Sequence, residues 1–200
     1  MISHKLKFIF IHIPKTSGNS LSLYLKDLVD NVVVQKNSLV GKNEGIQILC
    51  EYGKSDIKHA GIDYYKKIYG EKINDYFKFT IVRNPYDRIL SNYFFNKGDQ
   101  NQTFDRDEFI KFVEKSVKQL GFQCKAIDDS FHIVYFENLI NDLKKIECFK
   151  GHVDFEDYPT LNASFNSKID YNEIYDKELK ELVYNKYEKD FIRFGYLGGT

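Results

Sequence analysis

The stretch that decides the fold covers residues 6–21, LKFIFIHIPKTSGNSL. Its first half is a short run of apolar, aromatic and β-branched residues, which is typical of a strand buried in a parallel sheet. Its second half is a turn rich in small residues, after which leucines recur at helical spacing. The sequence therefore predicts a buried strand, a tight turn and a helix over residues 17–29.

The rest of the chain continues the alternation of strands and helices. Strands are predicted at 77–82 and 131–136, with weaker strand patterns at 32–34 and 46–49. Helical patterns cover residues 62–69, 86–95, 104–117, 139–149 and 176–194. This alternation predicts an α/β fold with a central, mainly parallel sheet flanked by helices. Ligands of such folds bind beyond the carboxyl ends of the strands, so we expect the chemistry at Lys15 and Arg83.

Length, charge and cysteine content limit the classes of function. The chain has 200 residues, which fits a single domain over residues 1–200. Its formal net charge is +0, whereas nucleic-acid binders usually carry a basic excess, so no nucleic-acid partner is expected. The three cysteines are far apart and lack CxxC spacing, which argues against a disulfide scaffold or a zinc site. Because no apolar run approaches about 18 residues and no signal-peptide pattern is present, we expect no membrane span and a cytoplasmic location.

The turn PKTSGNS has the features of an anion site. A helix N-terminus presents unpaired N–H groups and the positive end of the helix dipole. Gly18 lets the backbone approach a ligand, and Lys15 adds a mobile positive charge. Hydroxyl donors come from Thr16, Ser17 and Ser20. Since Lys15 precedes Gly18 and no glycine opens the loop, this is not the Walker A pattern GxxxxGK[ST]. For the loop alone, a plain turn with a solvent-facing lysine is the alternative.

The segment FIFIHIPKTSGNSL resembles the 5′-phosphosulfate loop of sulfotransferases that use 3′-phosphoadenosine-5′-phosphosulfate (PAPS). In the branch that includes carbohydrate sulfotransferases, this loop is roughly HIPKTGGTSL. Ser17 stands where that branch usually has Gly, and Asn19 where it usually has Thr. Both replacements are small and polar, although the second could change how the sulfonate is held. The resemblance implies that the phosphosulfate is cradled by Lys15, Thr16, Ser17, Gly18, Asn19 and Ser20.

The segment FKFTIVRNPYDRILSNY (77–93) resembles the 3′-phosphate element of the same family, in which a strand ends in Arg and a Ser follows one helical segment later. The resemblance implies that Arg83 clamps the 3′-phosphate with its planar fork and that Ser91 donates from the helix. For a lone arginine, a structural ion pair would be the better interpretation. Arg88 is expected to pack or pair on the helix face.

Further segments resemble the family toward the C-terminus, namely YFENL at 135–139, LNAS at 161–164 and a last helix ending in FGY at 196. The resemblance implies a three-layer fold like that of P-loop NTPases, PAPS as the donor and no metal. It also suggests a late loop that closes over the nucleotide, with Ser164 and Lys168 as candidate contacts. Ordinary loop residues are an equally good interpretation of these two.

Sulfuryl transfer needs an aligned donor, stabilisation of the leaving phosphate and removal of the acceptor proton. Lys15 and nearby backbone N–H groups would stabilise the leaving group. His59 is the first candidate for the general base, because relatives often carry a Lys-His pair between the two donor-binding elements and imidazole titrates near neutrality. His12 and Glu51 are the alternatives, and the sequence does not decide among the three.

The predicted activity is in-line transfer of a sulfuryl group from PAPS to a hydroxyl acceptor, with a glycan or glycolipid as the expected acceptor. The product would be 3′-phosphoadenosine-5′-phosphate (PAP). One alternative is a nucleotide-kinase-like P-loop enzyme, against which the missing Walker A pattern and the missing Mg²⁺-binding acidic motif argue. Another is an inactive protein of the same fold that still binds PAPS or PAP. The acceptor and the oligomeric state stay open.

Overall fold

A computed structural model describes residues 1–30, 32–37, 45–50, 59–97, 103–158 and 171–197, and for 32–37 and 45–50 it describes the backbone alone. The chain divides into two compact units. The first comprises Met1–Val82 and Ala126–Asn162, and the second comprises Arg83–Lys125 and Ala163–Thr200. Each unit has its own buried cluster of apolar side chains, so each is described by itself.

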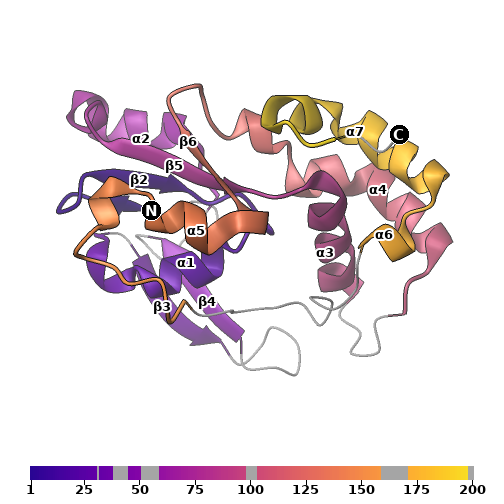
Figure 1. Ribbon diagram of the computed structural model, residues 1–200, viewed down its shortest axis with the longest axis horizontal. Coiled ribbons are helices and arrows are strands. Elements are labelled where there is room, and N and C mark those ends of the chain that lie inside the picture. Colours follow the sequence, from indigo (N-terminus) through magenta and orange to yellow (C-terminus); the bar gives the residue numbers. More distant parts are fainter. Residues whose placement is uncertain (31, 38–44, 51–58, 98–102, 159–170, 198–200) are drawn as a thin grey trace. The chain divides into compact units, whose positions relative to one another are not determined.

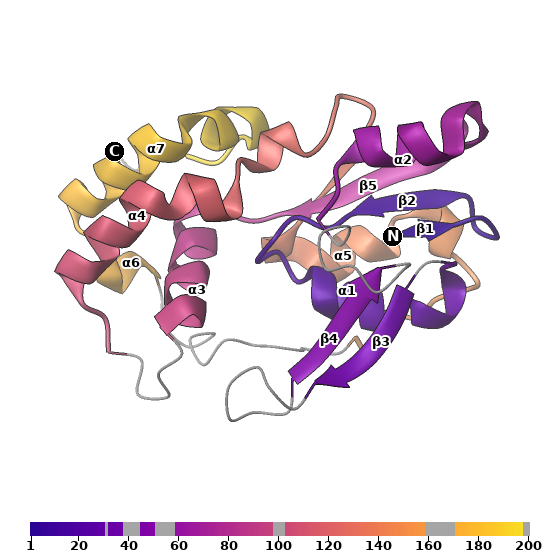
Figure 2. The same ribbon diagram turned by 180° about the vertical axis from the view of Figure 1, so that it is seen from behind.

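The first unit is built on a four-stranded sheet with the order β1-β2-β5-β6, in which β6 is labelled in Figure 1 and β1 in Figure 2. Its strands are β1 (Ile2–Ser3), β2 (Phe8–Ile11), β5 (Phe77–Val82) and β6 (His132–Tyr135). β2, β5 and β6 run parallel, and only β1 is antiparallel to its neighbour. Every residue of β2 is buried, as expected for a central parallel strand. The three strong strand predictions and the mainly parallel sheet are therefore confirmed.

Helices lie on both sides of this sheet. Figures 1 and 2 both place α2 (Ile62–Tyr69) on one side of the strands, and α1 (Gly18–Tyr24) and α5 (Leu139–Lys144) on the other. Because side chains alternate along a strand, Phe8 and Phe10 of β2 point to the same side and join one apolar cluster with Leu21 and Leu143. Short 3₁₀ turns extend this unit at Lys26–Leu28, Gly70–Ile73, Phe136–Asn138 and Glu147–Phe149.

Two further strands form a separate antiparallel pair. β3 (Val32–Asn37) pairs with β4 (Gly45–Cys50) in a two-stranded sheet. The weak strand patterns at 32–34 and 46–49 thus correspond to real strands. They are not part of the sheet that carries β2, which shows that the alternating pattern alone did not determine their partners.

The second unit is helical in the part that the structure describes. It contains α3 (Pro85–Lys97), α4 (Arg106–Leu120), the 3₁₀ turn Gln123–Lys125, α6 (Tyr171–Ile174) and α7 (Lys177–Phe194). The side chain of Asp105 caps α4 by accepting from the Glu108 N–H, and Asp176 caps α7 by accepting from Leu179. The predicted helices are confirmed, whereas the short α6 was not predicted.

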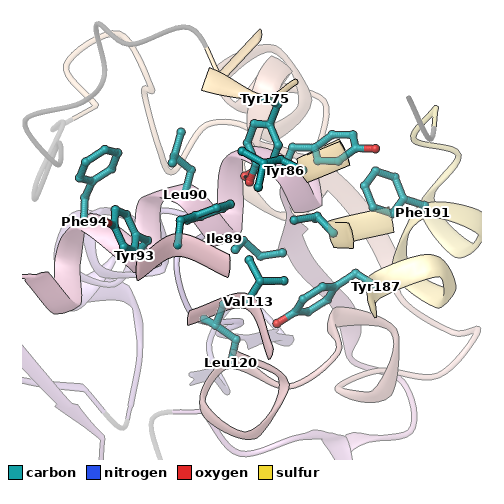
Figure 3. Packing of buried hydrophobic residues seen from close by; sticks show 13 residues of the cluster. Tyr86, Ile89, Leu90, Tyr93, Phe94, Val113, Leu120, Tyr175, Tyr187 and Phe191 are labelled. Atoms are coloured by element: carbon teal, nitrogen blue, oxygen red, sulfur yellow. Dashed lines mark hydrogen bonds between the residues drawn. The ribbon is translucent and has the colours of Figure 1, made fainter. Parts of the chain in front are cut away.

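The core of the second unit is rich in aromatic rings. Figure 3 shows side chains of α3, α4 and α7 meeting around Ile89 and Val113. Tyr86 packs against Tyr175 and Phe191, with ring centroids 5.1 and 4.8 Å apart. The buried Tyr175 hydroxyl donates to the carbonyl of Tyr86 at 2.9 Å. Large rings with satisfied hydroxyls thus give this small helical unit its core.

Candidate active site

The loop between β2 and α1 contains two residues in the left-handed region, Lys15 and Ser17, each with φ of 68°. α1 begins at Gly18 with Ser17 as its N-cap, and none of the described side chains caps it. The left-handed conformation costs an L-residue about 1–2 kcal/mol, and glycine adopts it readily. This explains why glycine suits the position of Ser17. Backbone N–H groups around left-handed residues form concavities that bind anions.

Two hydroxyl groups hold this loop in place. Thr16 is fully buried, and its Oγ1 donates to the Ile13 carbonyl at 2.8 Å. Ser17 Oγ lies 3.3 Å from the hydroxyl of Tyr158. Burial raises the pKa of Tyr158 to about 12, so its hydroxyl keeps its proton near neutral pH. Because the Thr16 hydroxyl is engaged inside the loop, this residue can offer a ligand mainly its backbone N–H. Ser20 is also buried, with 1% exposure.

Gly18 makes room for the imidazole of His12. A Cβ atom on Gly18 would lie 2.5 Å from Cγ of His12 and still closer to Cδ2 and Nε2. His12 follows β2 and is 7% exposed, so its ring is enclosed. The packing of the His12 ring therefore requires glycine at position 18, whether or not a ligand also approaches the backbone there.

His59 is joined to His12 through the backbone. Its Nδ1 lies 2.9 Å from the carbonyl oxygen of His12, and the two rings meet edge to face with centroids 4.6 Å apart. A carbonyl oxygen can only accept, so Nδ1 must carry the proton. The neutral imidazole then has its lone pair on Nε2, the nitrogen that can accept a proton. Of the two candidate histidines, His59 is exposed and His12 is buried. Glu51 lies outside the described residues.

Asn19 carries a buried oxygen that has no hydrogen-bond partner among the described residues. A buried acceptor left without a donor costs about 1–3 kcal/mol. The two ends of an amide are interchangeable in the assignment of its atoms. Either a donor from a ligand or rotation of the amide, so that its NH₂ group faces an anion, would satisfy this side chain.

A cavity of about 440 Å³ adjoins the loop at Ser17. Its other lining residues are Phe136, Leu139, Ile140, Lys144, Phe155, Glu156 and Tyr158. The size falls within the range of about 300–1,000 Å³ typical of small-molecule pockets, and the walls combine apolar side chains with polar ones. Lys144 and Glu156 form an ion pair of 3.2 Å at this cavity. A larger cavity of about 650 Å³, around residues 149–155, is lined by none of the predicted site residues that the structure describes.

In the second unit, Arg83 directly follows the last residue of β5. Its Nε donates to Asp87 Oδ2 at 2.6 Å. Its backbone N–H donates to Gln123 Oε1 at 3.0 Å, and its carbonyl accepts from Gln123 Nε2 at 2.9 Å. Ser91 lies on α3 and is 5% exposed. The spacing of four residues could have identified Asp87 as a partner of the Arg83 side chain. No sequence signal indicated that Gln123 binds the Arg83 backbone.

Arg88 serves the structure of this unit, as expected. It is 1% exposed and donates to the carbonyls of Leu120 and Gly121 at 2.9 and 3.1 Å, which are at the C-terminal end of α4. Burial lowers the pKa of Arg88 to about 10, while the carboxylate of Asp190, 3.8 Å away, acts in the opposite direction. The guanidinium thus stays charged near neutral pH. Ser164 and Lys168 lie outside the described residues, so their predicted role stays a prediction.

Among the described residues, no group of three or more His, Cys, Asp or Glu side chains could hold a metal ion. None of the helices in the described ranges is long and apolar enough to cross a membrane.

Comparison with known proteins places the chain in a family. No curated protein and no solved structure matches it. A profile described as "Sulfotransferase family" matches residues 1–157. The matched span contains the loop at Lys15, His59, and the pair Arg83 and Ser91. Because the match covers well over half of the 200 residues, the chain belongs to the sulfotransferase family.

Proposed function

We propose that this protein transfers a sulfuryl group from PAPS to a hydroxyl acceptor and releases PAP. Membership of the family supports sulfuryl transfer in general. The observation that supports PAPS is the loop that follows β2. It combines two left-handed residues, a helix start without a side-chain cap and a lysine, which together suit the anionic phosphosulfate.

We further propose that the two units work as one sulfotransferase domain over residues 1–200, with a P-loop-NTPase-like three-layer fold. Each unit is made of two separated stretches of sequence, so neither unit is a continuous segment. The helices on both sides of the parallel sheet in the first unit agree with three layers. Both donor-binding elements follow strands of this one sheet in the sequence, β2 and β5.

In this proposal Lys15 approaches the oxygen that bridges phosphorus and sulfur. Backbone N–H groups of residues 16–20 hold the 5′-phosphate oxygens. The cavity beside Ser17, with Phe136 and Phe155 in its walls, receives the adenine ring. Arg83 and Ser91 bind the 3′-phosphate, and Ser164 and Lys168 contribute from a late loop. No metal takes part in this scheme.

The chemical step forms one S–O bond, breaks another and moves one proton. The acceptor oxygen forms a bond to sulfur while the opposite S–O bond breaks, and that electron pair goes to the phosphate oxygen of PAP. His59 Nε2 takes the proton of the acceptor hydroxyl, in keeping with the tautomer that the His12 carbonyl imposes. His12 supports His59 through its carbonyl and supports Gly18 through its ring. His12 and Glu51 remain the alternative bases.

We propose a glycan or glycolipid hydroxyl as the acceptor, on the resemblance of the loop to carbohydrate sulfotransferases. We also propose a cytoplasmic location, where PAPS is made in bacterial-type cells. The free thiols of Cys124 and Cys148 agree with a reducing compartment.

Thermal unfolding tests the donor assignment. PAP at about 100 times its Kd should stabilise the fold by about 2.7 kcal/mol, a rise in Tm of roughly 5–10 °C for a chain of this size. ATP with Mg²⁺ is the comparison ligand, and Arg83→Ala should reduce the shift with PAP. A shift with ATP–Mg²⁺ and none with PAP would mean that the loop serves a kinase-like site instead.

A further inference from the structure

The side-chain amide of Gln123 forms two hydrogen bonds with the backbone of Arg83. Oε1 accepts from the Arg83 N–H at 3.0 Å, and Nε2 donates to the Arg83 carbonyl at 2.9 Å. Since an N–H can only donate and a carbonyl can only accept, the amide has one possible orientation here. Gln123 is 0% exposed, so both bonds are shielded from water.

Gln123 is in turn held by a buried carboxylate. Its own N–H donates to Asp190 Oδ2, and the next N–H, of Cys124, donates to Oδ1, each at 2.9 Å. Asp190 is 0% exposed, and the guanidinium of Arg88 balances its charge at 3.8 Å. Buried charges are retained when they are paired and hydrogen-bonded in this way. Asp190 of α7 therefore holds the backbone from which the Gln123 side chain extends.

The guanidinium of Arg83 is held separately. Its Nε donates to Asp87 Oδ2 at 2.6 Å, and the two side chains are 14% and 28% exposed. Arg83 is thus anchored at its backbone by Gln123 and at its head by Asp87. Ordering an arginine side chain when a ligand binds has an entropic cost, and holding it in position beforehand reduces that cost.

We propose that Gln123 is a positioning residue for Arg83, which fixes the point from which the guanidinium reaches the 3′-phosphate of the donor. This inference rests on the proposed function of Arg83. Gln123 touches no ligand in this account, and its effect is confined to the one phosphate that Arg83 binds.

The test compares two ligands that differ only in that phosphate. Calorimetric titration with PAP and with adenosine 5′-monophosphate (AMP) measures the contribution of the 3′-phosphate. Gln123→Met keeps the length of the side chain and removes both bonds to Arg83. We expect it to weaken PAP binding about three- to tenfold, the range for losing one pre-ordered side chain, and to change AMP binding less than about twofold. In an Arg83→Ala background the same substitution should have no further effect on PAP.

Tyr187→Phe is the matched control. It removes a buried 2.7 Å bond, to Ser116 Oγ in the same unit, without touching Arg83, and it should leave the ratio of PAP to AMP affinity unchanged. If Gln123→Met does not fold, Gln123→Glu keeps the acceptor for the Arg83 N–H, and a loss confined to PAP is again expected. Equal losses for both ligands, no loss, or full additivity with Arg83→Ala would overturn the inference. Equal affinity of the unmodified protein for PAP and AMP would instead overturn the proposed role of Arg83 itself.

Discussion

A single methyl group on Gly18 tests the packing of the candidate loop. The Cβ of Gly18→Ala would lie 2.5 Å from Cγ of His12, a distance that real Cβ contacts essentially never show. His12 is 7% exposed, so its ring has little space to move into. We expect the substitution either to displace the imidazole or to shift the start of α1.

The expected cost follows from two opposing effects. Overpacking of a filled site costs about 1–3 kcal/mol. Alanine is favoured over glycine in a helix by up to about 1 kcal/mol, and Gly18 is the first residue of α1. With the helical gain at its full value of about 1 kcal/mol, the net loss is about 0–2 kcal/mol, which for a chain of 200 residues lowers Tm by up to about 8 °C.

Thermal unfolding followed by circular dichroism, on the two single variants and the double variant with His12→Ala, isolates the contact. Without the imidazole, Gly18→Ala should be neutral or slightly stabilising, so the two sites should show a coupling equal to the overpacking cost, about 1–3 kcal/mol. Gly151→Ala is the control, because its φ of 74° makes alanine strained while no atom lies within 4 Å of the added Cβ. Its cost should not depend on His12. If Gly18→Ala costs as much without the imidazole as with it, the packing argument is refuted.

Four further substitutions have defined outcomes. Lys15→Ala should reduce the rate of sulfuryl transfer on the order of 10²–10³-fold in a steady-state assay, as for the loss of a preorganised donor at a developing charge; full activity would remove Lys15 from the chemistry. His59→Gln should abolish most transfer while calorimetry shows unchanged PAP affinity, and a parallel loss of affinity would assign His59 to donor binding. Tyr158 has a folded-state pKa of about 12 against an ordinary value of 10.0, so its contribution to stability is present below pH 10 and is lost as the pH rises toward 12, by about 1.4 kcal/mol per pH unit. Urea unfolding at pH values from about 9 to about 11, roughly one unit either side of that ordinary pKa, measures this loss. The free energy of unfolding should fall less steeply with pH in Tyr158→Phe than in the unmodified protein, and an equal slope would contradict the burial of this hydroxyl. Phe136→Ala should weaken PAP binding, whereas Ile68→Ala, at a half-exposed position of α2, should not; equal effects would exclude the cavity beside Ser17 as the adenine site.

The sequence predicted the parts of the fold that local patterns determine. The continuous apolar and β-branched run at β2 identified a buried parallel strand, and the pattern at β5 identified a second strand. The predicted helix over 139–149 was too long. α5 ends at Lys144, and Ile146 is extended with ψ of 115°, so the chain continues as a 3₁₀ turn. Apolar spacing does not reveal such a break, because Ile146 and Phe149 are buried all the same.

Contacts between distant residues could not be predicted from one sequence. Gln123 and Arg83 are 40 positions apart, and Ser17 and Tyr158 are 141 positions apart. Nothing in the local sequence of either pair indicates its partner, since both contacts depend on how the chain returns to the same place. The same holds for His59, whose proton position is fixed by a carbonyl 47 positions earlier. The sequence could suggest it as a candidate base but could not show which of its nitrogens carries the proton.

The most direct test of the account is ³¹P nuclear magnetic resonance of PAP bound to the protein, because PAP reports separately on its 5′- and 3′-phosphates. The account predicts that both resonances shift on binding, that Lys15→Ala reduces the shift of the 5′-phosphate alone, and that Arg83→Ala reduces the shift of the 3′-phosphate alone. If neither resonance shifts, or if both substitutions affect the same phosphate, the loop and the arginine do not bind the two ends of one donor, and the central claim is wrong.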